Sequence, residues 1–325
     1  MSASGGHGAG GRAPTLIWMP RPVPAVLSIA GSDSGGGAGI QADLKAFARC
    51  GVHGMTAITA LTAQSTTGVT GVHPVPGEFI VEQVRTVAED IGVDAVKIGM
   101  LGTAEAVAAV REALELLDGV PVVIDPVMVA ESGAVLLDDA ARAATIELLL
   151  PLATVITPNL PEARVLAGGS ERAETGGGDD RATGAGGDAR GAAAGGDDRA
   201  AAAGGDAEDL ARALHLLGPA NVVVTGGHRE DVVDVFFDGE TLERLPGERH
   251  PDGAAHGSGC THSSALAAHL ALGFTPLDAA RAARIIASEA VRAGLRGIGR
   301  GAGPVDVFDL TARAQQSPAR AELAR

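Results

Sequence analysis

Aromatic side chains are scarce in this chain of 325 residues. They make up 2% of the sequence and tyrosine is absent, although 46% of the residues are hydrophobic. A core built from this composition must be filled by small aliphatic side chains, mainly alanine and valine. The length is sufficient for one large core.

Cysteine and clustered positive charge are scarce as well. Cys50 and Cys260 are the only cysteines, which excludes a disulfide framework and gives no metal-ligand spacing. This usage is typical of a reducing cytoplasm. The formal net charge of -15, without any cluster of lysine and arginine, argues against a nucleic-acid or membrane-surface partner.

Long hydrophobic runs are also lacking. The apolar stretch from Leu16 to Met19 is too short, and too interrupted by prolines, for a signal peptide or a membrane span. The sequence therefore predicts a cytoplasmic protein whose first residues, 1–24, form a flexible arm rich in glycine, serine and proline.

Short apolar runs alternate with amphipathic helical patterns along most of the chain. Such runs are typical of parallel strands buried on both faces of a sheet. A different pattern, two strands around Asp238-Gly239, predicts a hairpin at the sheet edge. The pattern as a whole predicts one three-layer α/β domain over residues 25–310, followed by a tail over 311–325. The expected strands are 26–30, 55–61, 95–98, 120–124, 154–156, 221–225, 232–237 and 241–245.

Residues 169–205 do not fit that plan. They consist almost entirely of glycine, alanine, aspartate and arginine, with GGDDRA repeated imperfectly and no large aliphatic or aromatic side chain. Such a segment cannot bury enough surface to offset its ordering entropy. We expect a disordered surface insertion; the alternative is an interaction tether.

The segment HGSGCTHSSA, residues 256–265, is typical of an anion-binding loop that opens into a helix. Its glycines allow close backbone approach, Ser258 or Thr261 is suited to cap, and the helix contributes its positive end. Cys260 falls in the first turn, where backbone amides favour a thiolate and so a base or nucleophile. The alternative is an ordinary capped helix that contains a small buried cysteine.

A second glycine-rich turn, GSDSGGGAG over residues 31–39, follows the first strand and precedes a helix. Open α/β sheets bind ligands at such strand-to-helix turns. The turn lacks the Gly-Lys-Ser/Thr ending of a Walker loop, and it lacks a dinucleotide-binding pattern in register.

Taken together, these motifs resemble the bacterial hydroxymethylpyrimidine/phosphomethylpyrimidine kinases of thiamine biosynthesis. Those enzymes have a ribokinase-like fold, a three-layer α/β/α sandwich with a mostly parallel central sheet. The resemblance covers residues 26–306 apart from the insertion. It is carried by AGSDSGGGAGIQADLKAF, ITALTAQSTTGV, VKIGML, VVIDPVM, TPNLPEA, GGH, HGSGCT and GIGRGAGPVD.

The resemblance implies a pyrimidine pocket. The residues that it assigns to this pocket are Gly31, Ala38, Asp43, Gln64, Met100 and Val127. A glutamine amide matches the donors and acceptors on one edge of an aminopyrimidine, and the apolar residues form walls. Gln64 could instead satisfy backbone groups at a strand end, and Met100 and Val127 could be core residues.

The resemblance also implies a nucleotide side that binds ATP with Mg²⁺. Metal binding is assigned to Asp125 and Glu162, and nucleotide binding to Asn159, Thr225, Gly227 and Ser258. The phosphoryl group would lie against Gly257 and Gly259, with Cys260 as the base. Asn159 and Glu162 also match a helix capping box. Homodimers are common in this fold.

The chain departs from the family pattern at Thr225, where most members have a lysine before GGH. Its absence removes a positive charge from the phosphate site. Lys45 and Lys97 are the lysines close to the other motifs.

Three functions follow from these observations. The first is phosphorylation of 4-amino-5-hydroxymethyl-2-methylpyrimidine by ATP, followed by phosphorylation of the monophosphate to the diphosphate. The second is pyridoxal or pyridoxine phosphorylation on the same scaffold, against which Gln64 and Met100 argue. The third is a non-catalytic pyrimidine-binding regulator, suggested by Thr225, against which Asp125, Glu162 and Cys260 argue.

Overall fold

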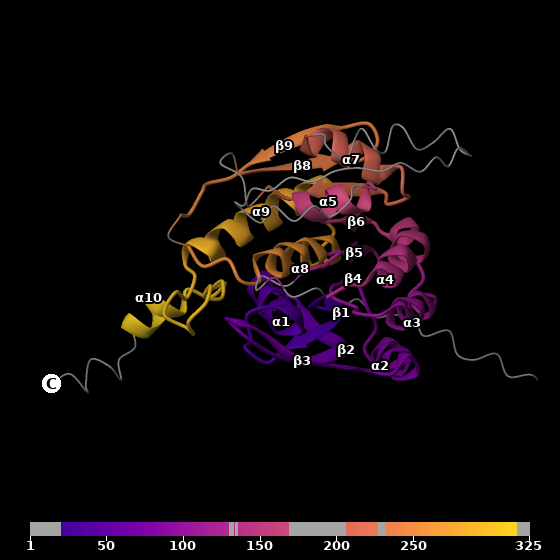
Figure 1. Ribbon diagram of the computed structural model, residues 1–325, viewed down its shortest axis with the longest axis horizontal. Coiled ribbons are helices and arrows are strands. Elements are labelled where there is room, and N and C mark those ends of the chain that lie inside the picture. The colour runs from indigo at the N-terminus through magenta and orange to yellow at the C-terminus, as the bar shows by residue number, and fades with distance from the viewer. Residues whose placement is uncertain are drawn as a thin grey trace, which may run out of the picture.

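The centre of the molecule is a parallel sheet that is extended by antiparallel strands at both edges. The structure, a computed structural model, describes residues 21–129, 133, 136–168, 206–226, 232–251 and 253–316. In these residues nine strands form one sheet in the order β3-β2-β1-β4-β5-β6-β7-β8-β9 (Figure 1). Neighbouring strands are parallel through the middle of the sheet, which consists of β2, β1, β4, β5, β6 and β7. At the edges, β3 pairs antiparallel with β2, β8 pairs antiparallel with β7, and β9 pairs antiparallel with β8.

The strands have the following bounds: β1 Ala25–Asp33, β2 His53–Ser65, β3 Gly68–Pro74, β4 Ala95–Ile98, β5 Val122–Ile124, β6 Val155–Ile156, β7 Asn221–Val224, β8 Val233–Phe237 and β9 Leu242–Pro246. The α-helices are α1 Gly39–Cys50, α2 Gly77–Asp90, α3 Ala104–Leu114, α4 Asp139–Ala144, α5 Leu160–Leu166, α7 Ala207–His215, α8 Ser258–Ala271, α9 Pro276–Arg292 and α10 Leu310–Gln315. A π-helical turn, Thr145–Leu149, and a 3₁₀ turn, Leu150–Leu152, follow α4.

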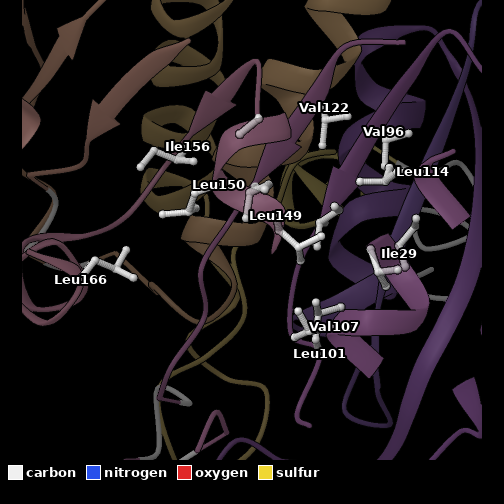
Figure 2. Packing of buried hydrophobic residues seen from close by; sticks show 14 of the residues in the cluster. Ile29, Val96, Leu101, Val107, Leu114, Val122, Leu149, Leu150, Ile156 and Leu166 are labelled. Atoms are coloured by element: carbon white, nitrogen blue, oxygen red, sulfur yellow. The ribbon is translucent and has the colours of Figure 1, made fainter. Parts of the chain in front are cut away.

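Helices cover both faces of the sheet, which gives the expected three layers. Helices α1, α8 and α9 pack on one face, and α2, α3, α4, α5 and α7 pack on the other (Figure 1). The larger core lies on the second face, where Ile29, Val96 and Ile156 from the strands meet Val107 and Leu166 from the helices (Figure 2). On the first face alanines such as Ala268 and Ala283 allow α8 and α9 to approach closely. The small-residue core expected from the composition is therefore confirmed.

The structure contains every predicted strand, with shifted ends, and the hairpin around Asp238-Gly239 lies at the sheet edge as predicted. Strand β3 was not predicted. Most of its residues are exposed, and Gly68, Gly71 and Pro74 obscure any strand pattern.

Two described features lie at the predicted ends of the domain. Arg21, placed in the flexible arm, donates to the carbonyl groups of Ile91 and Gly92 and forms an ion pair with Asp94. At the other end, helix α10 continues beyond residue 310, the predicted end of the domain. The insertion over residues 169–205 and Gly227 lie outside the described residues.

None of the helices in the described part of the chain has both the length and the apolar character needed to cross a bilayer.

Candidate active site

A cavity of about 530 Å³ opens where the parallel strands end at their carboxyl termini. Loops after β1, β4, β5, β6 and β7 form its wall together with the beginning of α8. In doubly wound sheets this edge is where ligands bind. The cavity brings together most of the predicted site residues, namely Gly31, Ala38, Gln64, Met100, Asp125, Val127, Asn159, Glu162, Thr225, Gly257, Ser258, Gly259 and Cys260.

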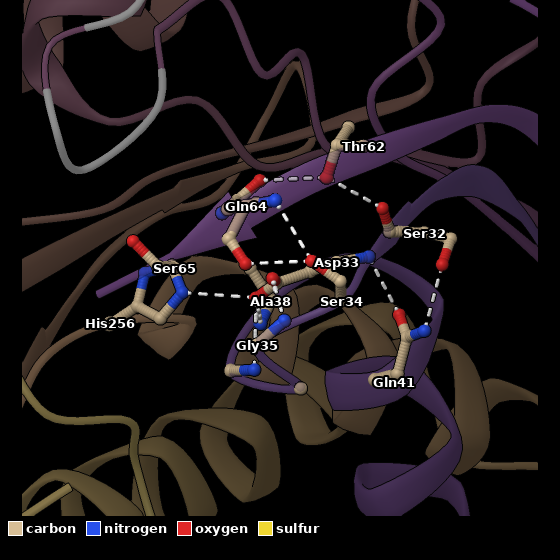
Figure 3. Close-up of polar contacts among 12 residues, drawn as sticks. Ser32, Asp33, Ser34, Gly35, Ala38, Gln41, Thr62, Gln64, Ser65 and His256 are labelled. Carbon is tan, nitrogen blue, oxygen red and sulfur yellow. Dashed lines mark hydrogen bonds and ion pairs between the residues drawn. The ribbon is translucent and has the colours of Figure 1, made fainter. Parts of the chain in front are cut away.

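The first glycine loop is held in shape by Asp33, a residue that the sequence analysis did not single out. Its carboxylate accepts hydrogen bonds from the backbone N–H groups of Gly35, Gly37 and Ala38, at 2.7 to 2.9 Å (Figure 3). Burial acts to raise the pKa of Asp33, but these bonds and one from His256 lower it below its usual value. The loop is thus closed around a buried carboxylate.

His256 connects this loop to the second one. Its Nε2 lies 3.1 Å from Oδ2 of Asp33, although 223 residues separate the two in the chain (Figure 3). The two glycine loops also touch directly, since a Cβ atom added to Gly257 would lie 1.8 Å from the carbonyl oxygen of Gly37. Glycine is required at this contact.

Helix α8 begins differently from the prediction. Its N-cap is Gly257, in the left-handed region with φ 84°, and no side chain caps the helix. The expectation that Ser258 or Thr261 caps it is wrong. Instead, Ser258, Gly259 and Cys260 of the first turn line the cavity; the Ser258 N–H donates to the Ala255 carbonyl, and the amides of Gly259 and Cys260 at the start of the helix are suited to an anion.

Burial acts against the thiolate that the sequence predicts at Cys260. Burial raises the pKa of the Cys260 thiol to about 12; the Lys97 ammonium opposes this rise, while Asp125 and Asp43 add to it. The residue is nevertheless only partly buried and it lines the cavity. Cys50 and Cys260 are both free, as expected.

Asp43 does not line the cavity, contrary to its assignment to the pyrimidine pocket. It is fully buried and accepts hydrogen bonds from Ser28, Ser264 and Lys97. Lys97 Nζ lies 3.0 Å from Oδ1 of Asp43 and 3.9 Å from Oδ2 of Asp125. Burial acts to lower the pKa of Lys97, but Asp43, Cys260 and Asp125 together outweigh it, and the pKa is raised. Asp43 therefore contributes to the site indirectly, because it holds and charges Lys97, which lines the cavity.

Asp125 and Glu162 form a buried acidic pair at the ends of β5 and β6. Burial and, second to it, the neighbouring Asp125 raise the pKa of Glu162 to about 8. Burial also raises the pKa of Asp125, against the effect of Lys97 and of a 3.0 Å hydrogen bond from Ser263. No group of three or more acidic, histidine or cysteine side chains suited to a metal ion occurs among the described residues.

The predicted capping box at the start of α5 is confirmed. The Glu162 N–H donates to Oδ1 of Asn159, and Oε2 of Glu162 accepts from the Asn159 N–H, both at 2.9 Å. Glu162 also accepts a hydrogen bond from the backbone of Met128. These bonds fix one carboxylate of the acidic pair at the cavity wall.

Gln64 and Met100 lie where a planar ring could contact them. The Gln64 carboxamide accepts only a long hydrogen bond of 3.3 Å, from Thr62, and is half-buried in the cavity wall (Figure 3). Met100 approaches Gly31 so closely that a Cβ atom there would lie 2.4 Å from Cε of Met100. Val127 is also half-buried in this wall.

Thr225 lines the cavity, where it pairs with Asn159 through an isolated bridge. Of the two lysines considered near it, Lys45 is exposed and donates to the carbonyl of Gly36, whereas Lys97 lines the cavity. Sequence reasoning missed Asp234, His262 and Arg284, which also belong to the wall. His262 lies within the segment HGSGCTHSSA, but Asp234 and Arg284 come from β8 and α9, and no short motif joins the three.

Comparison with known proteins places this architecture among the ribokinase-like small-molecule kinases. A pyridoxal kinase of Bacillus subtilis, solved as an ADP complex, superposes with a TM-score of 0.72 at 35% identity, over 89% of this chain and 99% of the other. The chain belongs to the phosphomethylpyrimidine kinase family, whose model matches residues 33–181 and 197–306.

Two curated relatives agree with this family. A hydroxymethylpyrimidine/phosphomethylpyrimidine kinase of Rhizobium meliloti is 44% identical over 87% of this chain and 96% of the relative. A thiamine biosynthesis bifunctional protein of Geobacter sulfurreducens is 41% identical over 88% of this chain, which spans 53% of that longer protein.

Proposed function

We propose that this protein phosphorylates 4-amino-5-hydroxymethyl-2-methylpyrimidine with ATP and then phosphorylates the monophosphate to the diphosphate, in thiamine biosynthesis. The observation that carries this proposal is the position of the uncapped start of α8, with Cys260, in the same cavity as Gln64 and Met100. One wall suits an anion, while the other suits a flat heterocycle.

In the first reaction the substrate hydroxymethyl oxygen bonds to the γ-phosphorus of ATP, and the bond from that phosphorus to the β–γ bridging oxygen breaks. ADP leaves with the electron pair of that bond. Cys260 takes the proton from the hydroxyl group, and the first-turn amides of α8 stabilise charge on the transferring phosphoryl group. The Lys97 ammonium acts to lower the pKa of Cys260 and so favours the thiolate, whereas burial acts to raise that pKa.

In the second reaction the attacking atom is an oxygen of the monophosphate. That oxygen is already ionised near neutral pH, since the second pKa of a phosphate monoester is about 6. The step therefore needs positioning and charge neutralisation but no base. The same amides of α8 serve both reactions.

The acidic pair Asp125 and Glu162 fits a divalent cation such as Mg²⁺. Burial raises the pKa of both carboxylates, and Asp125 adds to the rise at Glu162, so the pair is suited to a positive charge; Mg²⁺ is typically held by one or two carboxylates together with water and phosphate oxygens. When bound, Mg²⁺ neutralises charge on the phosphates. Asn159 keeps Glu162 in place through the capping box.

Pyridoxal phosphorylation is the second candidate, favoured by the pyridoxal kinases of Bacillus subtilis and Staphylococcus aureus among the similar structures. Incubation with Mg²⁺-ATP and, in separate reactions, the hydroxymethylpyrimidine, its monophosphate and pyridoxal distinguishes the two. We expect turnover of both pyrimidines at far lower concentrations than pyridoxal. Preference for pyridoxal would overturn the assignment, and no turnover of any acceptor would favour a regulator.

The cytoplasm is the proposed compartment, because the two cysteines are free and the reaction draws on ATP. A homodimer remains a prediction; the outer edge of β3, beside exposed Leu61 and Val72, offers one surface for it. Light scattering would measure the mass.

A further inference from the structure

A cluster of buried polar side chains lies on the cavity wall formed by β8, α8 and α9. It consists of Asp234, His262 and Arg284, whose side chains are 1%, 5% and 11% exposed. All three line the cavity. The chemistry proposed above uses none of them.

The cluster has more hydrogen-bonding capacity than its members use. Within the described residues, Nε of Arg284, Oδ2 of Asp234 and both ring nitrogens of His262 have no hydrogen-bond partner. The nearest approaches are loose: 3.6 Å from Arg284 to Asp234 and 3.5 Å from His262 to Asp234. Unpaired polar atoms cost free energy when buried, so the cluster is suited to a ligand that supplies the missing partner.

The position of Arg284 relative to Thr225 is the key observation. The Gly226 N–H, next to Thr225, donates to Oδ1 of Asp234 at 2.9 Å, and Oδ2 of the same carboxylate faces Arg284. One carboxylate group therefore separates the guanidinium from the end of β7. Nη2 of Arg284 donates to the Val232 carbonyl at 2.9 Å, which holds the side chain against this wall.

Arg284 is also the most suitable buried cation of the cavity wall; Arg249 lines the cavity as well, but it is exposed to solvent. Lys45 is bound to the Gly36 carbonyl at the exposed first loop, and Lys97 is paired with two carboxylates. Asp234 balances Arg284 only through a long contact, and burial lowers the pKa of His262, which leaves that ring neutral near pH 7. A guanidinium with a free N–H matches phosphate oxygens well.

We propose that Arg284 binds the polyphosphate chain of the nucleotide, and thereby supplies from α9 the positive charge that Thr225 does not provide. This inference rests on the proposed kinase function. It assigns a nucleotide-binding role to a residue outside the glycine loops. His262 and Asp234 then orient the guanidinium.

Binding of ATP, ADP, AMP and adenosine to wild type and Arg284→Gln tests this role by calorimetry. A hydrogen bond to a charged group contributes about 1.5–3 kcal/mol, so we expect the affinity for ATP and ADP to fall about tenfold to a hundredfold. The affinity for adenosine should stay within about twofold, because adenosine has no phosphate. Arg284→Lys should retain most of the ATP affinity. Equal losses for adenosine and ATP, or no loss for ATP, would overturn the proposal.

Two further variants separate charge from folding. Arg281→Gln removes an exposed arginine from the same helix and should leave ATP affinity unchanged. Adding Thr225→Lys to Arg284→Gln should restore ATP affinity, whereas Thr225→Lys alone should have little effect. If the combined variant folds, as judged by its melting temperature, and ATP affinity is not restored, the proposed exchange of charges is wrong. Wild-type protein that bound no ATP would instead refute the kinase function.

Discussion

At the scale of single residues, the site depends on the charges around Cys260. Lys97 is fully buried among Asp43, Asp125 and Cys260, and it is the cation that favours the Cys260 thiolate. The amides of α8 act against burial, which raises the pKa of Cys260 to about 12. The proposed base therefore depends on its neighbours.

Cys260→Ala should separate the two reactions. Turnover of the hydroxymethylpyrimidine should fall about a hundredfold or more, because its hydroxyl proton loses its acceptor. Turnover of the monophosphate should change little, since the attacking oxygen is already ionised and the backbone amides remain. Steady-state rates with each acceptor measure the difference. Equal losses would show that Cys260 acts by packing.

Lys97→Met should destabilise the protein by about 3–5 kcal/mol, because it leaves the buried Asp43 carboxylate without its ionic partner. Unfolding in urea measures this change. Lys45→Met is the matched control, since Lys45 is exposed, and should alter the free energy of unfolding by less than about 0.5 kcal/mol. A small loss for Lys97→Met would mean that water or another group compensates the charge of Asp43.

Sequence reasoning located contacts within motifs better than contacts between them. The capping box from Asn159 to Glu162 spans four residues and could be predicted from the local pattern. The pairing of Asp43 with Lys97, and the approach of Arg284 to Asp234, join different elements. Such partners depend on strand order and helix packing, and no local pattern encodes them.

At the scale of secondary-structure elements, the site is built from strand and helix ends. The six-residue motif HGSGCT predicted the start of α8, but the cap is a backbone conformation of Gly257, not a side chain. The reason is spatial: the loop must touch Gly37 of the first glycine loop. A residue with a side chain at position 257 could not approach the Gly37 carbonyl as closely as glycine does.

Gly257→Ala tests this contact. Alanine at φ 84° is strained, and its Cβ atom would collide with the Gly37 carbonyl, so we expect a loss of about 1–3 kcal/mol in stability and lower turnover of both acceptors. Gly259→Ala is the control: an added Cβ there meets nothing within 4 Å, and alanine favours the helix. Similar melting temperatures for both variants would contradict the contact.

Glu162→Gln should change how stability depends on pH. The pKa of Glu162 is raised to about 8 in the folded protein from 4.5, so folding favours its protonated form. This stabilising contribution is present below about pH 4.5 and is lost as pH rises to about 8. Wild type should therefore lose stability over that range relative to Glu162→Gln, as followed by melting temperature.

Adding Mg²⁺ to wild type and to Glu162→Gln, with melting temperature as the measurement, tests the proposed metal site. At pH 8 it should raise the melting temperature of wild type, because a divalent cation stabilises the ionised acidic pair, and it should have a smaller effect on Glu162→Gln. Equal Mg²⁺ effects on both proteins would remove Glu162 from the proposed metal site.

At the scale of the whole molecule, the fold was predictable because its parallel strands are buried apolar runs. Val26–Ala30 and Ala95–Ile98 are examples, and both lie within predicted strands. Strand β3 could not be found, since its exposed residues carry no pattern of burial. Helices α5 and α7 flank residues 169–205, and both contribute to one core through Leu166 and Leu210.

Replacing residues 169–205 with a short glycine–serine linker should leave kinase activity and melting temperature nearly unchanged, because their composition offers no side chains to bury. Asp206→Ala, which removes the N-cap of α7, is a useful reference and should cost about 1 kcal/mol. A larger loss on replacement than on Asp206→Ala would show that the segment packs or acts.

The pairing of Asp33 with His256 has a consequence for synthesis on the ribosome. The first strand to emerge, β1, takes a central place in the sheet, and its loop reaches its partner only after residue 256; the His256 backbone in turn bonds to Gly303 and Val305. Half-made chains therefore lack an assembled pocket. Nascent protein would bind neither substrate nor nucleotide until nearly the last residues of the domain leave the tunnel, so ligands cannot assist the early stages of folding.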